Sequence, residues 1–434
     1  MIGSPGGETK KLGPLVGAID LGSCSIRFTV FVAATGELVT YHQLPVETQT
    51  PKPGWLELNP NDIISAVIKC IDATVLNLEK LDIEPVDVVA VGVASQRCTA
   101  IAWDKTTGCL MYPGCIMAAD VRTQSLVDEL KKSRYIKEEA IRTLSGLPLS
   151  TYFSAIKFKW LLENDDQVKT ALSEDRLLLG TCNSYLMWAL TGGTEGGIHI
   201  TDVTNASLTG LMNLETLAWD EKLCKYFGVP IDILPKIRSC SEVYGSLNIS
   251  CLKGIPVSGC IGDQQAALIG QNCWRPGQAK ISFGNGAFTL FNVGPKLLHS
   301  QFGLLSTVAY KIGENPPIYA FEGSVKEAGS IISWLSSIGI SCHLDDKTTS
   351  SKQPNYDNNM ILIPSSSGCL SPHWRSSCEG IIVGLTTCSP GTSNAEDIYQ
   401  AALQAVAFQN RDVLEAMERD SKIKLTTILT DGGN

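Results

Sequence analysis

The sequence lacks the features of membrane-spanning, nucleic-acid-binding and secreted proteins. Its longest apolar runs, such as residues 86–94, are far too short to cross a bilayer. The formal net charge of −9 argues against nucleic acid and anionic membranes as main partners. The polar N-terminal residues contain no apolar segment of the kind found in signal peptides. These absences favour a cytoplasmic protein that is not inserted in a membrane and that acts on small molecules.

Cysteine and histidine occur without the spacing of disulfide or metal sites. The 15 cysteines are an odd number and form no C-x-x-C pair, and the five histidines are isolated. We therefore expect reduced thiols and no zinc site. Catalytic chemistry would then depend on carboxylates, arginine and backbone amides.

The length and composition are those of a globular protein with more than one core. The chain has 434 residues, of which 44% are hydrophobic and 18% are charged, which indicates two domains. We expect a flexible leader at 1–14, a first domain at 15–262 and a second domain at 263–434.

Two stretches share one pattern: a strand, a glycine turn and a second strand. The first spans residues 15–31 with its turn near Gly22, and the second spans residues 280–293 with its turn at Gly284–Gly286. Such turns expose backbone N–H groups that can bind phosphate oxygens. Two such hairpins facing each other would form a clamp for a polyphosphate.

The remaining pattern mixes helices and strands, which predicts an α/β fold. The apolar run at 86–94 predicts a buried central strand. Residues 201–209 read as a polar loop, and residues 425–430 as a strand. Asn61 is the predicted N-cap of a helix, and Ser393 with Glu396 the capping box of a long helix ending near Met417. Further helices are expected at 122–132, 154–164 and 183–190, and a helix opened by Asp263 at 264–270.

Polar residues at the ends of predicted strands are the candidates for chemistry. Asp20 ends the first strand and could hold a hydrated Mg²⁺, although an ordinary Asp-Gly hairpin also explains it. Arg97 follows the buried strand, where open α/β sheets place ligand groups, or it pairs with a surface carboxylate. Asp263 begins a helix and is either a site residue or an N-cap. Tyr152 could reach a ligand or simply pack.

Five motifs together resemble the FGGY carbohydrate kinases. They are Pro51-Lys-Pro-Gly-Trp55, Thr201-Asp-Val-Thr-Asn-Ala-Ser207, Ser241-Glu-Val-Tyr-Gly245, Ser258-Gly-Cys-Ile-Gly-Asp-Gln-Gln-Ala-Ala-Leu268 and Asn410-Arg-Asp-Val-Leu-Glu-Ala-Met417. The resemblance implies two ribonuclease-H/actin-like domains around a nucleotide cleft, with ATP and Mg²⁺ as cofactors and a small polyol as substrate. Within the family these motifs favour glycerol as the acceptor and sn-glycerol 3-phosphate as the product. The resemblance leaves a homo-oligomer open.

The resemblance also implies a role for individual residues. Asp263 would be the general base and would also contact the substrate, and Asp20 would lie near Mg²⁺. The other residues expected to bind the polyol are Arg97, Tyr152, Gln264 and Phe288. The residues expected to bind the nucleotide are Ser23, Cys24, Arg27, Gly284, Asn285, Gly329, Gly432 and Gly433.

Several positions depart from the family pattern. Cys24 replaces a hydroxyl residue of the first turn, and Asn285 replaces a threonine of the second. Cys98 stands where the family members that act on glycerol have Glu, Ala118 where they have Trp, and Leu370 replaces a glycine. A wider polyol pocket would suit a larger polyol or ketose. Alternatively, the protein is a catalytically weak member with a binding or regulatory role.

The family pattern also continues beyond the last residue of this chain. Asp431-Gly-Gly would begin the adenine-binding turn, which a helix and further strands would follow. We therefore expect a truncated second domain with an unprotected sheet edge.

Overall fold

The computed structural model describes residues 13–132, 137–340, 360–365, 368–375, 377–386 and 394–432. The chain forms two compact units, the first from residues 1–266 and 308–317 and the second from residues 267–307 and 318–434. The division at 266/267 lies within a helix, close to the boundary expected at 262/263. Most of the expected leader lies outside the described residues.

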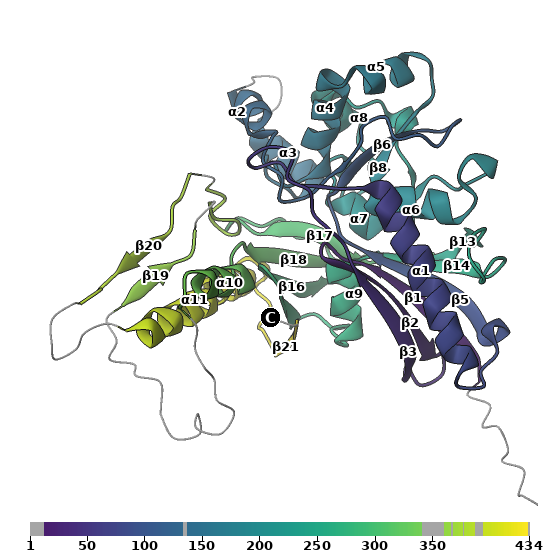
Figure 1. Cartoon of the computed structure of the whole chain (residues 1–434). Helices are drawn as coiled ribbons and strands as arrows, with labels where there is room; N and C mark the ends of the chain where they lie inside the picture. The colour runs from purple at the N-terminus through teal and green to yellow at the C-terminus, as the bar shows by residue number, and fades with distance from the viewer. Residues whose placement is uncertain are drawn as a thin grey trace, which may run out of the picture. The chain divides into compact units, whose positions relative to one another are not determined.

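The first unit is built on a six-stranded sheet in the order β13-β14-β5-β1-β2-β3. β1 pairs antiparallel with β2, and β5 lies between β1 and β14 with all three parallel. Helix α1 packs along β2 and β3 (Figure 1). The first predicted hairpin and the predicted central strand are therefore confirmed. The bounds are β1 Leu15–Leu21, β2 Ser25–Val32, β3 Leu38–Pro45, β5 Val88–Ser95, β13 Ser241–Ser246, β14 Pro256–Gly262 and α1 Pro60–Glu79.

A four-stranded sheet in the order β4-β7-β6-β8 and several short elements complete the first unit. Its strands are β4 Glu57–Leu58, β6 Ala100–Asp104, β7 Cys115–Ile116 and β8 Leu177–Thr181. The short paired strands are β9 Ile200–Asp202 with β12 Lys236–Arg238, and β10 Met212–Asn213 with β11 Ala218–Trp219. The helices are α2 Gln124–Lys132, α3 Glu138–Ser145, α4 Ser154–Asn164, α5 Asp166–Ser173, α6 Cys182–Leu190, α7 Val203–Ser207 and α8 Glu221–Phe227. The predicted helices at 122–132, 154–164 and 183–190 correspond to α2, α4 and α6.

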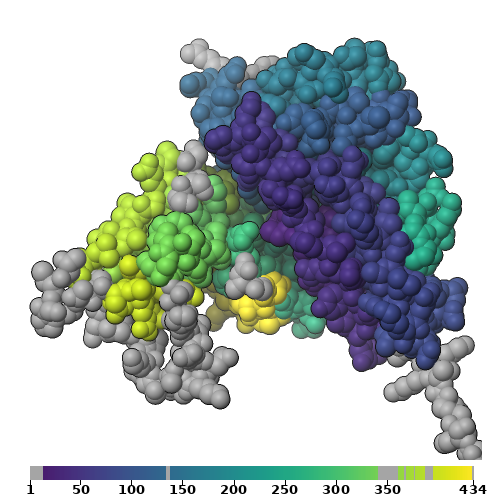
Figure 2. All heavy atoms as spheres, viewed as in Figure 1, coloured from purple at the N-terminus to yellow at the C-terminus, as the bar shows by residue number. Residues whose placement is uncertain are grey.

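The second unit is built on a five-stranded sheet in the order β17-β18-β16-β15-β21. β15 and β16 form the second predicted hairpin. β21 is an edge strand with a partly exposed surface (Figure 2). The bounds are β15 Gln278–Phe283, β16 Ala287–Gly294, β17 Leu305–Tyr310, β18 Ile318–Val325, β19 Ile361–Ile363, β20 Ile381–Val383, β21 Thr427–Gly432, α10 Gly329–Ser337 and α11 Ala395–Ser421. Helix α9, Asp263–Gly270, spans the division between the units and is the helix predicted at Asp263.

Close packing in the first core explains why the β1–β2 hairpin forms. Ile19, Phe28 and Val93 are buried in one cluster with the apolar face of α1. Gly17 allows the approach of the two strands, because a Cβ there would lie 2.5 Å from Cζ of Phe28. The alternation of apolar residues along β1 therefore places Asp20 on the opposite face to the core.

Three local predictions were wrong. The N-cap of α1 is Asn59, whose side chain accepts the Asn61 N–H, because Pro60 fits the first helical position. The capping box of α11 lies one residue later than predicted, between Asn394 and Asp397. Residues 200–207 form β9 and α7 and are buried; they are not a loop, because Asp202 caps α7 and accepts hydrogen bonds from Thr204 and Asn205.

The described ranges contain no helix with the length and apolar character needed to cross a membrane. The thirteen cysteines in those ranges are all free thiols.

Replacing the N-cap of α1 should cost measurable stability. We expect Asn59→Ala to lower the free energy of unfolding by about 1 kcal/mol, because it removes the acceptor for an otherwise unsatisfied N–H at the helix start. Asn61→Ala is the matched control and should change little. The first transition of a urea unfolding curve, followed by circular dichroism, measures both. Equal losses for the two variants would contradict the assignment of Asn59.

Candidate active site

The carboxyl ends of three neighbouring parallel strands lie level in the first unit. Ser95 at the end of β5 is in register with Leu21 of β1 and with Gly262 of β14. Arg97 and Asp263 follow this level and Asp20 lies one residue before it; these are polar residues that the sequence singled out. Open α/β sheets bind ligands at this edge. The fold thus brings Asp20, Arg97 and Asp263 together.

An ion pair joins two of these residues. Nε of Arg97 lies 3.3 Å from Oδ1 of Asp263, and the two side chains are 2% and 30% exposed. Arg97 Nη1 also donates to Oε1 of Gln265 at 3.3 Å, and the fully buried Gln265 donates from Nε2 to the Val308 carbonyl. The arginine is therefore held from inside the protein while the carboxylate remains open to solvent. Such an arrangement fixes the direction in which the carboxylate points.

Gly262 allows the ion pair to sit at the strand end. A Cβ at this position would lie 2.7 Å from Oε1 of Gln265 and 2.8 Å from Cδ of Arg97. The Gly262 N–H donates to Oγ1 of Thr204 at 2.8 Å. Any side chain here would displace Arg97, so the glycine is needed for close approach.

Gln96 connects the end of β5 to the turn after β1. Its N–H donates to the Leu21 carbonyl at 2.7 Å, and its Nε2 donates to the Gly22 carbonyl at 3.0 Å. The turn itself is closed by the Gly22 N–H, which donates to the Ser25 carbonyl at 3.0 Å. The side chains of Ser23 and Cys24 are exposed at its tip, 3.7 Å apart.

Asp20 and Arg27 lie opposite each other on β1 and β2. Burial and the nearby Asp263 carboxylate raise the pKa of Asp20 above its usual value, and Arg27 lowers it by a smaller amount. Arg27 donates from Nε to the side chain of Gln43 at 2.9 Å and lies over the ring of Tyr41. A carboxylate whose charge is disfavoured by desolvation and by a second carboxylate nearby marks a place where a cation is favoured.

The expected polyol residues of the first unit lie on two turns. Tyr152 is half-buried just before α4, with its ring packed edge-on against Phe153. Cys98 is fully buried in the left-handed conformation with φ of 65°, and its thiol donates to the Leu208 carbonyl at 3.3 Å. Ala118 is partly exposed, and Gln264 lies half-buried in the first turn of α9.

A buried polar cluster supports β14 from behind. Asp202 caps α7 by accepting the N–H groups of Thr204 and Asn205, and it also accepts the Thr204 hydroxyl. Burial raises the pKa of Asp202, and these hydrogen bonds oppose that rise. Because Thr204 in turn accepts from Gly262, this cluster fixes the strand end that carries Asp263.

In the second unit, the Gly284–Gly286 turn packs against the start of α10. The Gly284 carbonyl accepts the Gly329 N–H at 2.9 Å, and the Asn285 carbonyl accepts the N–H groups of Ala328 and Ser330. Gly286 has no room for a side chain, because a Cβ would lie 2.7 Å from the Val325 carbonyl. The predicted turn is therefore confirmed as a tight one that is held by the N-terminus of a helix.

The other expected residues of the second unit lie on its central sheet. Phe288 is on β16, opposite Ser282 and Ser324. Gly432 pairs with Phe283 at the end of β21 with φ of 124°, and a Cβ there would clash with the Phe283 carbonyl. Gly433 lies outside the described residues.

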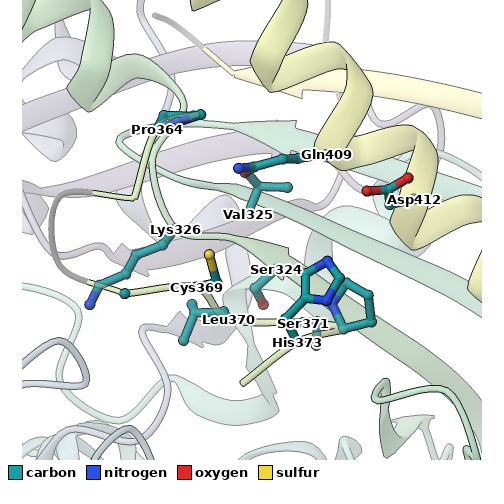
Figure 3. Close-up of a pocket in the computed structure, with 12 residues that line it drawn as sticks. Ser324, Val325, Lys326, Pro364, Cys369, Leu370, Ser371, His373, Gln409 and Asp412 are labelled. Atoms are coloured by element: carbon teal, nitrogen blue, oxygen red, sulfur yellow. The ribbon is translucent and has the colours of Figure 1, made fainter. Parts of the chain in front are cut away.

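A pocket in the second unit lies beside the end of β18 (Figure 3). Gln409 and Asp412 line it from α11, and a loop supplies Leu370, one of the positions that depart from the family pattern. Burial lowers the pKa of Lys326 in this pocket.

Four residues of the site went beyond the roles that the sequence suggested. Gln96 and Gln265 were visible as polar residues at strand and helix ends, but their hydrogen bonds were not. Thr204 appeared only as part of a polar stretch. Lys157 is fully buried on α4 and donates to the carbonyls of Cys98 and Tyr152. It gave no signal, because a lysine in a helix is ordinarily a surface residue.

Comparison with known proteins assigns the chain to a family. The model of the FGGY family of carbohydrate kinases, N-terminal domain, matches residues 15–270, and that of the C-terminal domain matches residues 279–434. The chain belongs to the FGGY family of carbohydrate kinases. Its members are phosphotransferases with an alcohol group as acceptor, and their kinase activity implies ATP as the phosphoryl donor.

Several proteins named glycerol kinase are similar in sequence to this chain over most of its length. A glycerol kinase from Brucella anthropi is 43% identical over 422 residues, which are 96% of this chain and 82% of the relative. A probable glycerol kinase from Caenorhabditis elegans is 41% identical over 424 residues, with the same coverage of each chain. The crystal structure of Plasmodium falciparum glycerol kinase with ADP superposes with a TM-score of 0.85 at 32% identity, covering 97% of this chain and 82% of the other. The predicted two-domain ribonuclease-H/actin-like fold is confirmed.

Replacing Gly262 should disturb catalysis through Arg97. We expect Gly262→Ala to lower kcat/KM for the alcohol substrate by about 10²-fold, because an added methyl group must push Arg97 or Gln265 out of place. Gly270→Ala, at the other end of α9, is the matched control, because a Cβ there meets nothing within 4 Å. Steady-state kinetics with thermal melting as a folding check would decide, and equal kinetics for both variants would contradict the argument.

Proposed function

We propose that the protein transfers the γ-phosphoryl group of ATP to glycerol and forms sn-glycerol 3-phosphate. The relatives named glycerol kinase support glycerol as the acceptor. The observation that carries the mechanism is the solvent-open Asp263 carboxylate, which is held by a buried Arg97 at the edge where three parallel strands end.

In this proposal Asp263 is the general base. Both described hydrogen-bonding contacts of the carboxylate, from Arg97 Nε and from its own helix at Gln264 N, go to Oδ1. Oδ2 would therefore take the proton of the attacking hydroxyl. Phosphoryl transfer depends mostly on positioning and charge neutralisation, so one oriented carboxylate is enough to accept this proton.

Arg97, Tyr152 and Gln264 would hold the polyol by hydrogen bonds, and Phe288 would pack against its carbon atoms. The tips of the two glycine turns would contact the nucleotide through Ser23, Cys24, Arg27, Gly284 and Asn285, with Gly329, Gly432 and Gly433 next to it. Both turns are tight in the structure, which suits close approach of phosphate oxygens to the backbone.

Asp20 would hold Mg²⁺ together with phosphate oxygens. The residues fit this ion, since Mg²⁺ prefers oxygen ligands and is commonly bound through one or two carboxylates plus substrate phosphates. Desolvation and, after it, the Asp263 carboxylate raise the pKa of Asp20, and a cation would offset both effects. When bound, Mg²⁺ supplies positive charge that offsets the charge on the phosphates.

A larger polyol or ketose is the second candidate substrate. Ala118 leaves a partly exposed position where the glycerol-specific pattern has Trp, and Cys98 offers a thiol where that pattern has a carboxylate. Losing a buried acceptor from a site built on hydrogen bonds strongly lowers discrimination between substrates.

We further propose that the protein acts in the cytoplasm, and that a homo-oligomer is compatible with this function.

The function is tested by ADP release across a panel of polyols. We expect glycerol to be turned over, and Asp263→Asn to lower kcat by about 10²–10⁴-fold because the general base is lost. Asp62→Asn, the same change at an exposed residue of α1, serves as a control. A longer polyol that outperforms glycerol would favour the second candidate. No turnover of any polyol would favour a binding or regulatory role and refute the kinase proposal.

Replacing Asp20 should raise the stability of the protein and lower its activity. The folded protein holds a proton on Asp20 more tightly than the unfolded chain, so this group lowers stability as the pH rises from 3.8 through its raised pKa. At neutral pH, Asp20→Asn removes that cost and should raise Tm. It should also weaken activation by Mg²⁺ by at least about 10-fold. Melting curves and Mg²⁺ titrations of activity measure the two effects, and a lower Tm would contradict the electrostatic argument.

A further inference from the structure

A fully buried lysine lies beneath the two turns that carry the expected polyol residues. Lys157 is on α4 and has no exposed surface. Its Nζ donates to the Tyr152 carbonyl at 2.5 Å and to the carbonyls of Phe153 and Cys98 at 3.5 Å each. The three protons of one ammonium group thus meet three backbone carbonyls.

These carbonyls come from two segments that are distant in sequence. Cys98 follows Arg97 in the turn after β5, while Tyr152 and Phe153 precede α4. The Cys98 backbone is in the left-handed region, which is uncommon for a residue other than glycine. An unfavourable backbone conformation persists when the surrounding contacts over-determine it, and the Lys157 ammonium is one such contact.

The burial of this charge is costly. Within the described part of the chain, no ion pair is found for Lys157. The titratable groups that act on it are the Cys98 thiol and then Asp120 and Arg122, which are paired with each other. Burial lowers the pKa of Lys157 to about 8. A methionine would fill the same space without this cost but would leave the three carbonyls without this donor, so apolar packing does not explain the lysine.

We propose that Lys157 is a positioning residue that holds the Arg97 turn and the Tyr152 turn together, and so sets the geometry of the polyol site. This inference rests on the proposed function. Lys157 itself touches no substrate; it acts through the backbone that carries Arg97 and Tyr152. The nucleotide-binding residues lie outside its contacts, so its effect should be confined to the alcohol substrate.

The test is Lys157→Met, with Lys159→Met on the same helix as the matched control. Lys159 pairs with Glu163 near the surface. We expect Lys157→Met to lower kcat/KM for glycerol by about 10²-fold while KM for ATP stays unchanged, because only the polyol site loses its geometry. Lys159→Met should leave both parameters unchanged. A melting curve is recorded for each variant.

Hydrogen exchange gives a readout that does not depend on turnover. Amides of residues 96–99 and 151–153 should exchange faster in Lys157→Met than in wild type, and those of Lys159→Met should not. If wild type phosphorylates no polyol, the proposed function fails, and the exchange rates still decide the inference. Unchanged exchange in both segments, or equal changes in KM for glycerol and ATP, would overturn it. Should Lys157→Met not fold, Lys157→Arg, which keeps the donors, must retain slow exchange in both segments.

Discussion

The level alignment of the carboxyl ends of β1, β5 and β14 is the constraint on which the candidate site depends. Parallel hydrogen bonding fixes this register, and a slip of one residue would turn each side chain to the other face of the sheet. Only in this register does Arg97 reach both Asp263 and Gln265 while remaining nearly buried. The Arg97–Asp263 ion pair thus depends on strand pairing in the core as well as on the attraction between the two charges.

Buried polar groups behind the site hold the strand ends and turns in position, at some cost to the stability of the fold. Asp202 and Lys157 are both fully buried, and each binds the backbone or side chains that hold a strand end or a turn. Satisfied groups of this kind rigidify a structure, whereas a missing partner leaves a costly unpaired polar atom. On the solvent side of the site, desolvation and the charge of Asp263 disfavour the ionised form of Asp20. Hydrogen-bonded buried groups therefore hold the backbone beneath the site, and a disfavoured negative charge lies at its surface.

Much of the fold could be predicted from local sequence patterns. The two hairpins, the central strand and the helix at Asp263 follow from apolar alternation and from glycine turns, and the structure confirms them. The N-cap of α1 could not be chosen correctly, because Asn59 and Asn61 are equally good capping residues until Pro60 is placed in the first turn. Lys157 was beyond reach, and so were the contacts of Gln265, since both depend on groups that only the tertiary fold brings near. The roles assigned to the individual site residues stay predictions.

The departures from the family pattern lie outside the helices and strands, at Cys24, Cys98, Ala118, Asn285 and Leu370, so the elements of the fold are separate from the positions that vary. Cys98 shows how this separation works. Its backbone carbonyl is held by Lys157 independently of its side chain, while its thiol donates to the Leu208 carbonyl. Ala118 is partly exposed and its small side chain leaves room. In the proposed function, catalysis would depend on the strand ends and on the ion pair, whereas substrate choice would depend on side chains at the turns. Substitutions at the turns can therefore change which alcohol binds without moving the carboxylate that would accept its proton.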